Sequence, residues 1–80
     1  TLEYGSNTLE MHKDALQSGQ NVVIIDDLLA TGGTIGACAE LCQSMNANVI
    51  GALFVIELIG LNAREYLSPI EVHSLLNFPA

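Results

Sequence analysis

The chain has 80 residues and carries 2 Lys and Arg against 9 Asp and Glu, so its net charge of −7 disfavours binding to a nucleic acid or an anionic membrane. Apolar residues make up 50% and charged residues 14%, a composition that excludes intrinsic disorder. Two Cys are too few for a disulfide scaffold, and no apolar run approaches the roughly 18–20 residues that span a bilayer. We therefore expect a cytoplasmic protein with reduced thiols.

The apolar content exceeds what a chain of this length can hide. A domain of about this size buries only about 60–65% of the surface of its unfolded chain. We therefore expect the chain either to oligomerise or to be part of something larger.

The first residues predict a β-hairpin. Residues 2–4 and 9–11 are short extended pieces, and the Gly-Ser-Asn sequence of residues 5–7 predicts the turn between them. The segment is polar enough to form an exposed arm.

A strand, a helix and a second strand follow within about 35 residues. Residues 22–25 form a continuous β-branched run, and residues 49–56 are a second apolar run, as in strands of parallel sheets that are buried on both faces. Between them, apolar residues at helical spacing predict a helix that ends near Ser44. A short helix over residues 62–67 and a last strand over residues 72–76 complete an α/β fold.

The sequence V-V-I-I-D-D-L-L-A-T-G-G-T at residues 22–34 carries the candidate site. We expect the first strand to end in Asp26 and Asp27, which places two carboxylates at the edge where open α/β sheets bind ligands. The turn of residues 31–34 leads into the helix, whose unpaired N–H groups and dipole can bind an anion without Lys or Arg. A phosphate at the turn and a diol near the acids together describe a ribose 5-phosphate.

Other readings of this turn have less support. The P-loop motif needs a Lys that is absent here, and the dinucleotide-binding fingerprint fails because only Gly32-Gly33-x-x-Gly36 is present. Paired Asp residues could also hold a metal ion or accept a phosphoryl group, but neither role needs this turn. An ordinary strand-to-helix turn with an N-capping Thr is the remaining structural alternative.

The motif D-D-L-L-A-T-G-G-T resembles the phosphoribosyl-pyrophosphate motif of the type I phosphoribosyltransferase family. With Leu-Glu-Tyr-Gly at residues 2–5 and Lys-Asp-Ala-Leu at residues 13–16, the chain is similar to the adenine phosphoribosyltransferases within it. The resemblance implies part of a Rossmann-like parallel sheet with an N-terminal hairpin arm. It also implies that residues 1–80 are the C-terminal portion of one domain, with a flexible catalytic loop at 1–12 and a phosphoribosyl-binding core at 21–80.

The resemblance also implies roles for individual residues. Asp26 and Asp27 would bind the ribose hydroxyls, and Glu3, Tyr4 and Asp26 would act in catalysis. Leu58, at the end of the second strand, would contact the base. The 5-phosphate would be held by Ala30, Thr31, Gly32, Gly33 and Thr34.

The activity implied by the resemblance is a pentosyl transfer in purine salvage. Adenine and phosphoribosyl pyrophosphate would give AMP and pyrophosphate, with Mg²⁺ held by the substrate and by no direct protein ligand. The complete chain would form a homodimer, and the 80-residue portion alone would be inactive. Two alternatives remain: a regulatory domain that senses phosphoribosyl pyrophosphate or nucleotides without catalysis, and an unrelated phosphosugar-binding α/β enzyme.

Several other polar residues are expected to be structural. His12 and His73 are isolated and lack a metal-ligand pattern, and Glu57 is expected to accept local hydrogen bonds or to face solvent. Cys38 and Cys42 lie four residues apart within the apolar stripe of the helix, which favours core packing over zinc binding or catalysis.

Overall fold

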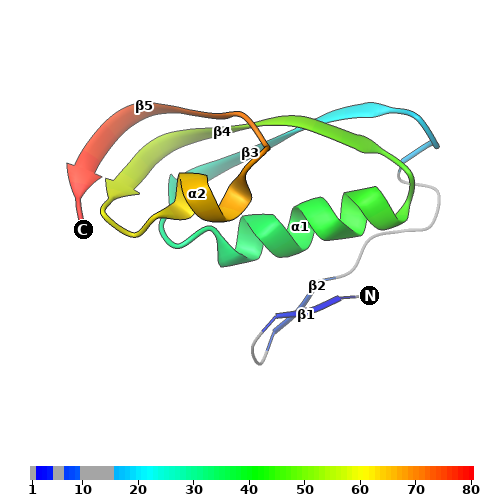
Figure 1. Ribbon diagram of the computed structural model, residues 1–80, viewed down its shortest axis with the longest axis horizontal. Helices are drawn as coiled ribbons and strands as arrows, with labels where there is room; N and C mark the ends of the chain where they lie inside the picture. The colour runs from blue at the N-terminus through cyan, green and yellow to red at the C-terminus, as the bar shows by residue number, and fades with distance from the viewer. Residues whose placement is uncertain (1, 5–6, 10–15) are drawn as a thin grey trace.

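The computed structural model describes residues 2–4, 7–9 and 16–80. Its centre is a parallel sheet of β3 (Asn21–Leu29), β4 (Asn48–Ile59) and β5 (Val72–Pro79), in that order. The helices α1 (Gly33–Ser44) and α2 (Ala63–Leu67) lie together on one face of this sheet (Figure 1). The predicted α/β fold with its strand–helix–strand unit is confirmed.

The structure corrects several predicted boundaries, since β4 runs to Ile59 and β5 to Pro79, where ends at residues 56 and 76 were expected. β3 continues to Leu29, so Asp26 and Asp27 lie within the strand rather than at its end. Leu28 and Leu29 still pair with β4, which explains the longer strand. In the N-terminal hairpin the strands are β1 (Leu2–Tyr4) and β2 (Asn7–Leu9), so Asn7 pairs with Tyr4 instead of forming the turn. The rest of the predicted second hairpin strand, residues 10–11, lies outside the described residues.

The core forms between the sheet and the two helices. Leu29 and Phe54 are its largest fully buried side chains, and Ala39 of α1 and Leu67 of α2 pack into the same cluster. The opposite sheet face remains open in the described part of the chain. The prediction that the strands are buried on both faces is therefore wrong for residues such as Val23, Ile25, Leu53 and Val55, which are exposed.

The edge strand β3 and the central strand β4 both depart from alternating burial near the carboxyl end of the sheet. Ile24 and Leu29 are five residues apart in β3, and Phe54 and Glu57 are three apart in β4, yet all four are buried. Strict alternation would place the members of each pair on opposite faces. Burial in β3 and β4 therefore does not follow strict alternation at this end, where Leu29 joins the core and Glu57 accepts a hydrogen bond from Arg64 of α2.

The hairpin backbone lies beside α1, on the side of the helix away from the three-stranded sheet (Figure 1). None of the helices described over residues 16–80 is long and apolar enough to cross a membrane.

Candidate functional site

The carboxyl end of β3 and the start of α1 enclose a cavity of about 150 Å³. This is smaller than the roughly 300–1,000 Å³ of sites for drug-sized ligands, so it suits a small anion rather than a whole nucleotide. The cavity is lined by Asp26, Leu28, Leu29, Ala30, Thr31, Gly32, Gly33, Thr34 and Ile35. The structure thus brings Asp26 together with all five residues predicted to hold a phosphate.

The first turn of α1 has no side-chain cap. The N-cap residue is Gly32, and Thr31 Oγ1 accepts only a long hydrogen bond of 3.4 Å from the Gly33 N–H. The first helical backbone bond is donated by the Gly36 N–H to the Gly32 carbonyl, at 2.8 Å. The N–H groups of Thr34 and Ile35 precede it and have no intrahelical acceptor. The alternative of an ordinary turn capped by Thr therefore does not describe this helix.

Gly32 makes this geometry possible. Its φ of +89° lies in the left-handed region, which a side chain at this position disfavours. Gly32 and Gly33 are both buried, so the backbone itself forms the wall of the cavity. N–H groups that lack an acceptor within the helix normally find another partner, and the helix dipole favours a negatively charged one. The turn is suited to an anion bound by backbone groups alone.

The two acids differ in their relation to the cavity. Asp26 lines it, and its Oδ1 accepts a hydrogen bond of 2.8 Å from the Asp27 N–H. Asp27 does not belong to the lining, although both acids are exposed. The structure therefore places Asp26 beside the turn, while the ribose contacts of both acids stay predictions.

Three other predicted site residues lie outside the lining of this cavity. Leu58 is half-buried at the carboxyl end of β4, and Glu3 and Tyr4 lie in β1 beside α1. Their roles in base contact and catalysis stay predictions. Leu28, Leu29 and Ile35, in contrast, line the cavity although the sequence analysis did not assign them to the site. Their position directly beside the motif was the available signal.

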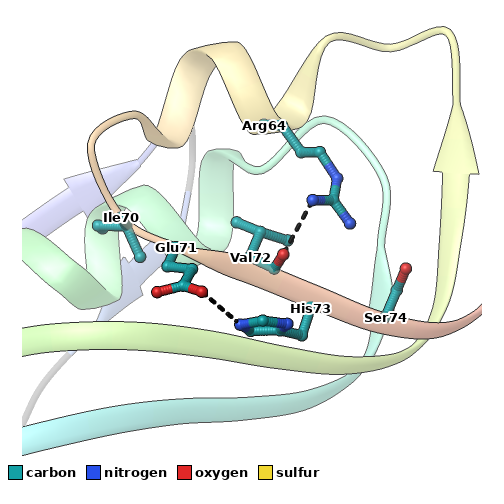
Figure 2. A pocket seen from close by; sticks show the side chains of 6 residues that line it. All are labelled: Arg64, Ile70, Glu71, Val72, His73 and Ser74. Atoms are coloured by element: carbon teal, nitrogen blue, oxygen red, sulfur yellow. Dashed lines mark hydrogen bonds and ion pairs between the residues drawn. The ribbon is translucent and has the colours of Figure 1, made fainter.

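A larger hollow of about 510 Å³ lies away from the motif, between α2 and β5 (Figure 2). Arg64 at its edge is already engaged, since its Nε and Nη2 bond both oxygens of Glu57 and its Nη1 donates to the Val72 carbonyl. His73 is exposed, and its Nε2 lies 3.0 Å from Oε1 of Glu71. With the positive charge of Arg64 paired, this hollow is a weaker anion site than the uncapped turn.

Glu57 accepts local hydrogen bonds, as predicted, and it does not face solvent. It is 8% exposed and accepts a hydrogen bond of 2.8 Å from Ser74 Oγ in addition to its two from Arg64. The hydrogen bonds from Arg64 lower the pKa of Glu57, although burial opposes this effect. The carboxylate is therefore held in its charged form as part of the framework.

The two thiols lie in the packed side of α1, as the prediction of core packing expects. Cys42 is buried and Cys38 is half-buried against the core. Burial raises the pKa of Cys38, and the neighbouring Cys42 and the charge of Asp26 raise it further. His12 lies outside the described residues. Within residues 2–4, 7–9 and 16–80, no three His, Cys, Asp or Glu side chains group as metal ligands.

Comparison with known proteins agrees with this geometry. The sequence profile of the phosphoribosyl transferase domain matches residues 2–74. A curated adenine phosphoribosyltransferase of Carboxydothermus hydrogenoformans is 54% identical over 77 residues, which make up 96% of this chain and 45% of that protein.

Solved structures give the same result. The adenine phosphoribosyltransferase of Thermoanaerobacter pseudethanolicus matches with a TM-score of 0.93 and 48% identity, over 96% of this chain and 46% of that one. The enzyme of Saccharomyces cerevisiae, complexed with an iminoaltritol bisphosphate and adenine, matches with a TM-score of 0.84 and 42% identity, over 95% and 43%. The chain thus spans less than half the length of these relatives. The profile match, which covers most of its residues, shows that the chain belongs to the phosphoribosyl transferase domain family.

Proposed function

We propose that the full-length protein transfers the phosphoribosyl group of phosphoribosyl pyrophosphate to adenine, giving AMP and pyrophosphate in purine salvage. Relatives named adenine phosphoribosyltransferase, about half identical over nearly all of this chain, support the reaction. In this proposal the 80 residues supply the phosphoribosyl-binding part of the site.

The uncapped start of α1 is the observation that carries the proposal. A 5-phosphate in the cavity would accept hydrogen bonds from the N–H groups of Thr34 and Ile35 and would interact favourably with the helix dipole. The hydroxyls of Thr31 and Thr34, both exposed, are further donors at its rim. This arrangement lets a chain with a net charge of −7 bind a phosphate ester without a basic side chain at the turn.

Asp26 supplies the second part of the chemistry. When the bond from the anomeric carbon to pyrophosphate breaks, positive charge develops on the ribose ring. A carboxylate beside the sugar stabilises that charge, and it also accepts hydrogen bonds from the ribose hydroxyls. Asp26 shares the cavity with the turn of residues 31–34, so a sugar anchored there by its 5-phosphate would lie against this carboxylate. A further acid or base at the purine, the role proposed for Glu3 or Tyr4, would exchange a proton with the base.

Mg²⁺ is proposed to enter on the substrate. Mg²⁺ keeps several waters and is commonly bound together with substrate phosphates, so the pyrophosphate and the sugar hydroxyls would hold it without a direct protein ligand. Asp26 and Asp27 are proposed to bind the ribose hydroxyls of that substrate. When bound, the ion would neutralise the charge of the departing pyrophosphate.

The test is an AMP-forming assay on the full-length protein with adenine, phosphoribosyl pyrophosphate and Mg²⁺. Replacing Asp26 and Asp27 together by Asn should abolish most of the turnover, whereas Glu40→Gln, an exposed control on α1, should not change it. Full activity of the double variant would overturn the assigned roles. Calorimetric titrations with adenine, hypoxanthine and orotate would separate an adenine enzyme from one with another base preference. Tight phosphoribosyl pyrophosphate binding without turnover would favour the regulatory alternative.

We also propose a cytosolic setting and a homodimer. Both thiols are unpaired in α1, which suits a reducing compartment, and the open apolar sheet face is surface that further protein could cover. Light scattering on the full-length protein would give the oligomeric state, and a monomer would contradict the second proposal.

A further inference from the structure

The short helix α2 packs against the turn of residues 31–34, here called the phosphate turn, on the side of Gly32. A Cβ placed on Gly32 would lie 3.4 Å from carbon atoms of Ala63, Tyr66 and Leu67. One placed on Gly36, in the first turn of α1, would lie 2.8 Å from Cε2 of Tyr66. The turn and the helix are therefore in van der Waals contact, and the glycines allow this close approach.

An ion pair fixes α2 to the sheet. Arg64 leaves α2 and bonds Glu57 of β4 through Nε at 2.8 Å and Nη2 at 2.9 Å. Its Nη1 donates to the Val72 carbonyl of β5 at 2.9 Å, and Figure 2 shows this bond reaching from α2 to the strand. One guanidinium thus joins α2 to two strands, a geometry that the fork of Arg allows and that the single ammonium of Lys does not.

The bonds of Arg64 to Glu57 and to the Val72 carbonyl, here called the clamp, carry a cost in free energy that is offset only if they serve to hold α2 in place. Burying Glu57 incurs a desolvation cost that a well-packed apolar pair would avoid. α2 has only five residues, so it is too short to hold its own conformation without tertiary contacts. The ion pair and the buried Ala63 and Leu67 supply those contacts.

We propose that α2 is a buttress for the phosphate turn, meaning that its contacts hold the backbone N–H groups of the turn in the direction that binds the 5-phosphate. Tyr66 and Arg64 are the positioning residues. The inference rests on the proposed function for its ligand. Anion binding by backbone N–H groups depends on their direction, since a hydrogen bond weakens steeply when its angle falls. Among the residues that the structure describes, no basic side chain lines the cavity, so none of them compensates for a misdirected N–H group. Tyr66 acts from behind Gly36, and Arg64 acts through the placement of α2.

The test compares Tyr66→Ala and Arg64→Lys with two matched controls in the full-length protein. Tyr66→Phe keeps the ring that contacts Gly36, and Glu71→Gln breaks only the exposed contact with His73. The two test variants should raise the KM for phosphoribosyl pyrophosphate about tenfold, the equivalent of losing roughly one hydrogen bond to a charged group. The KM for adenine and the kcat should change much less, and both controls should match the unmodified protein.

A purely structural role predicts a different pattern. Tyr66→Ala and Arg64→Lys would then lower the melting temperature while the folded fraction kept its KM, and this result would overturn the proposal. A further variant, Arg64→Gln, removes the charge that Arg64→Lys keeps. A raised KM in Arg64→Gln with an unchanged KM in Arg64→Lys and Tyr66→Ala would also overturn the proposal, because it would indicate a direct effect of the Arg64 charge on the ligand.

Hydrogen exchange separates failure of the buttress from failure of the proposed function. Without any ligand, the amides of Gly33, Thr34 and Ile35 should exchange faster in Tyr66→Ala than in Tyr66→Phe. Equal exchange would refute the buttress even in an active enzyme. An unmodified protein that bound no phosphoribosyl compound would refute the proposed function, and the exchange comparison would still decide the role of α2.

Discussion

Replacing Gly32 by Ala tests the role of the backbone at the phosphate turn. Gly32 has a φ of +89°, and an Ala Cβ there would lie in ordinary contact distance, 3.4 Å, from its three nearest neighbours. The cost therefore arises from the backbone conformation rather than from a clash. The left-handed region costs an L residue about 1–2 kcal/mol, and Ala restricts the unfolded chain by about 0.4–1 kcal/mol, which leaves a net loss near 1 kcal/mol.

Gly19 provides a matched control for this strain. Its φ is +84°, and a Cβ there would meet nothing within 4 Å. Gly19→Ala and Gly32→Ala should therefore lower the free energy of unfolding in urea by similar amounts. Only Gly32→Ala should weaken ribose 5-phosphate binding in calorimetry, by roughly tenfold or more if one charge-assisted hydrogen bond of about 1.5–3 kcal/mol is lost. Equal ligand affinity in the two variants would refute the assignment of the turn.

Three further predictions concern the framework. Glu57→Gln should destabilise the protein at neutral pH, because it removes the charge that pairs with Arg64. Since Arg64 lowers the pKa of Glu57, the stability that this charge contributes is complete above the ordinary carboxyl pKa and is lost as the pH falls through the lowered value. Urea titrations of the unmodified protein and of Glu57→Gln should therefore give converging free energies of unfolding in acid. Leu29→Ala empties a fully buried position and should cost about 2–5 kcal/mol in the same titrations; a loss below 1 kcal/mol would contradict the described core. Cys38 should react with iodoacetamide at neutral pH more slowly than free cysteine, since burial raises its pKa, and rapid labelling would show that α1 opens.

The parallel fold was predictable because its signals are local. The β-branched run at residues 22–25, the apolar run at residues 49–56 and the helical spacing between them correctly predicted β3, α1 and β4. The length of β3 was not predictable from the same signals. Asp26 and Asp27 interrupt the apolar pattern, yet pairing of Leu28 and Leu29 with β4 extends the strand past them. Pairing between distant segments overrides a local change in polarity.

The candidate site was partly predictable for the same reason. Asp26 and residues 30–34 lie within one short stretch of sequence, so the motif predicted the proximity that the structure shows. The contact of Tyr66 with Gly36 and the clamp of Arg64 on Glu57 join segments that no sequence spacing connects. The missing side-chain cap of α1 is likewise a matter of geometry, because Thr31 and Thr34 are both residue types that could have capped it.

The most direct test of the phosphate-binding turn is an amide NMR titration of the full-length protein with ribose 5-phosphate and, separately, with ribose. Binding at the turn requires that ribose 5-phosphate shifts the amide signals of Gly32, Gly33, Thr34 and Ile35, and that ribose at the same concentration leaves them in place. Unmoved signals at the turn, with shifts around Arg64 and His73 instead, would contradict it.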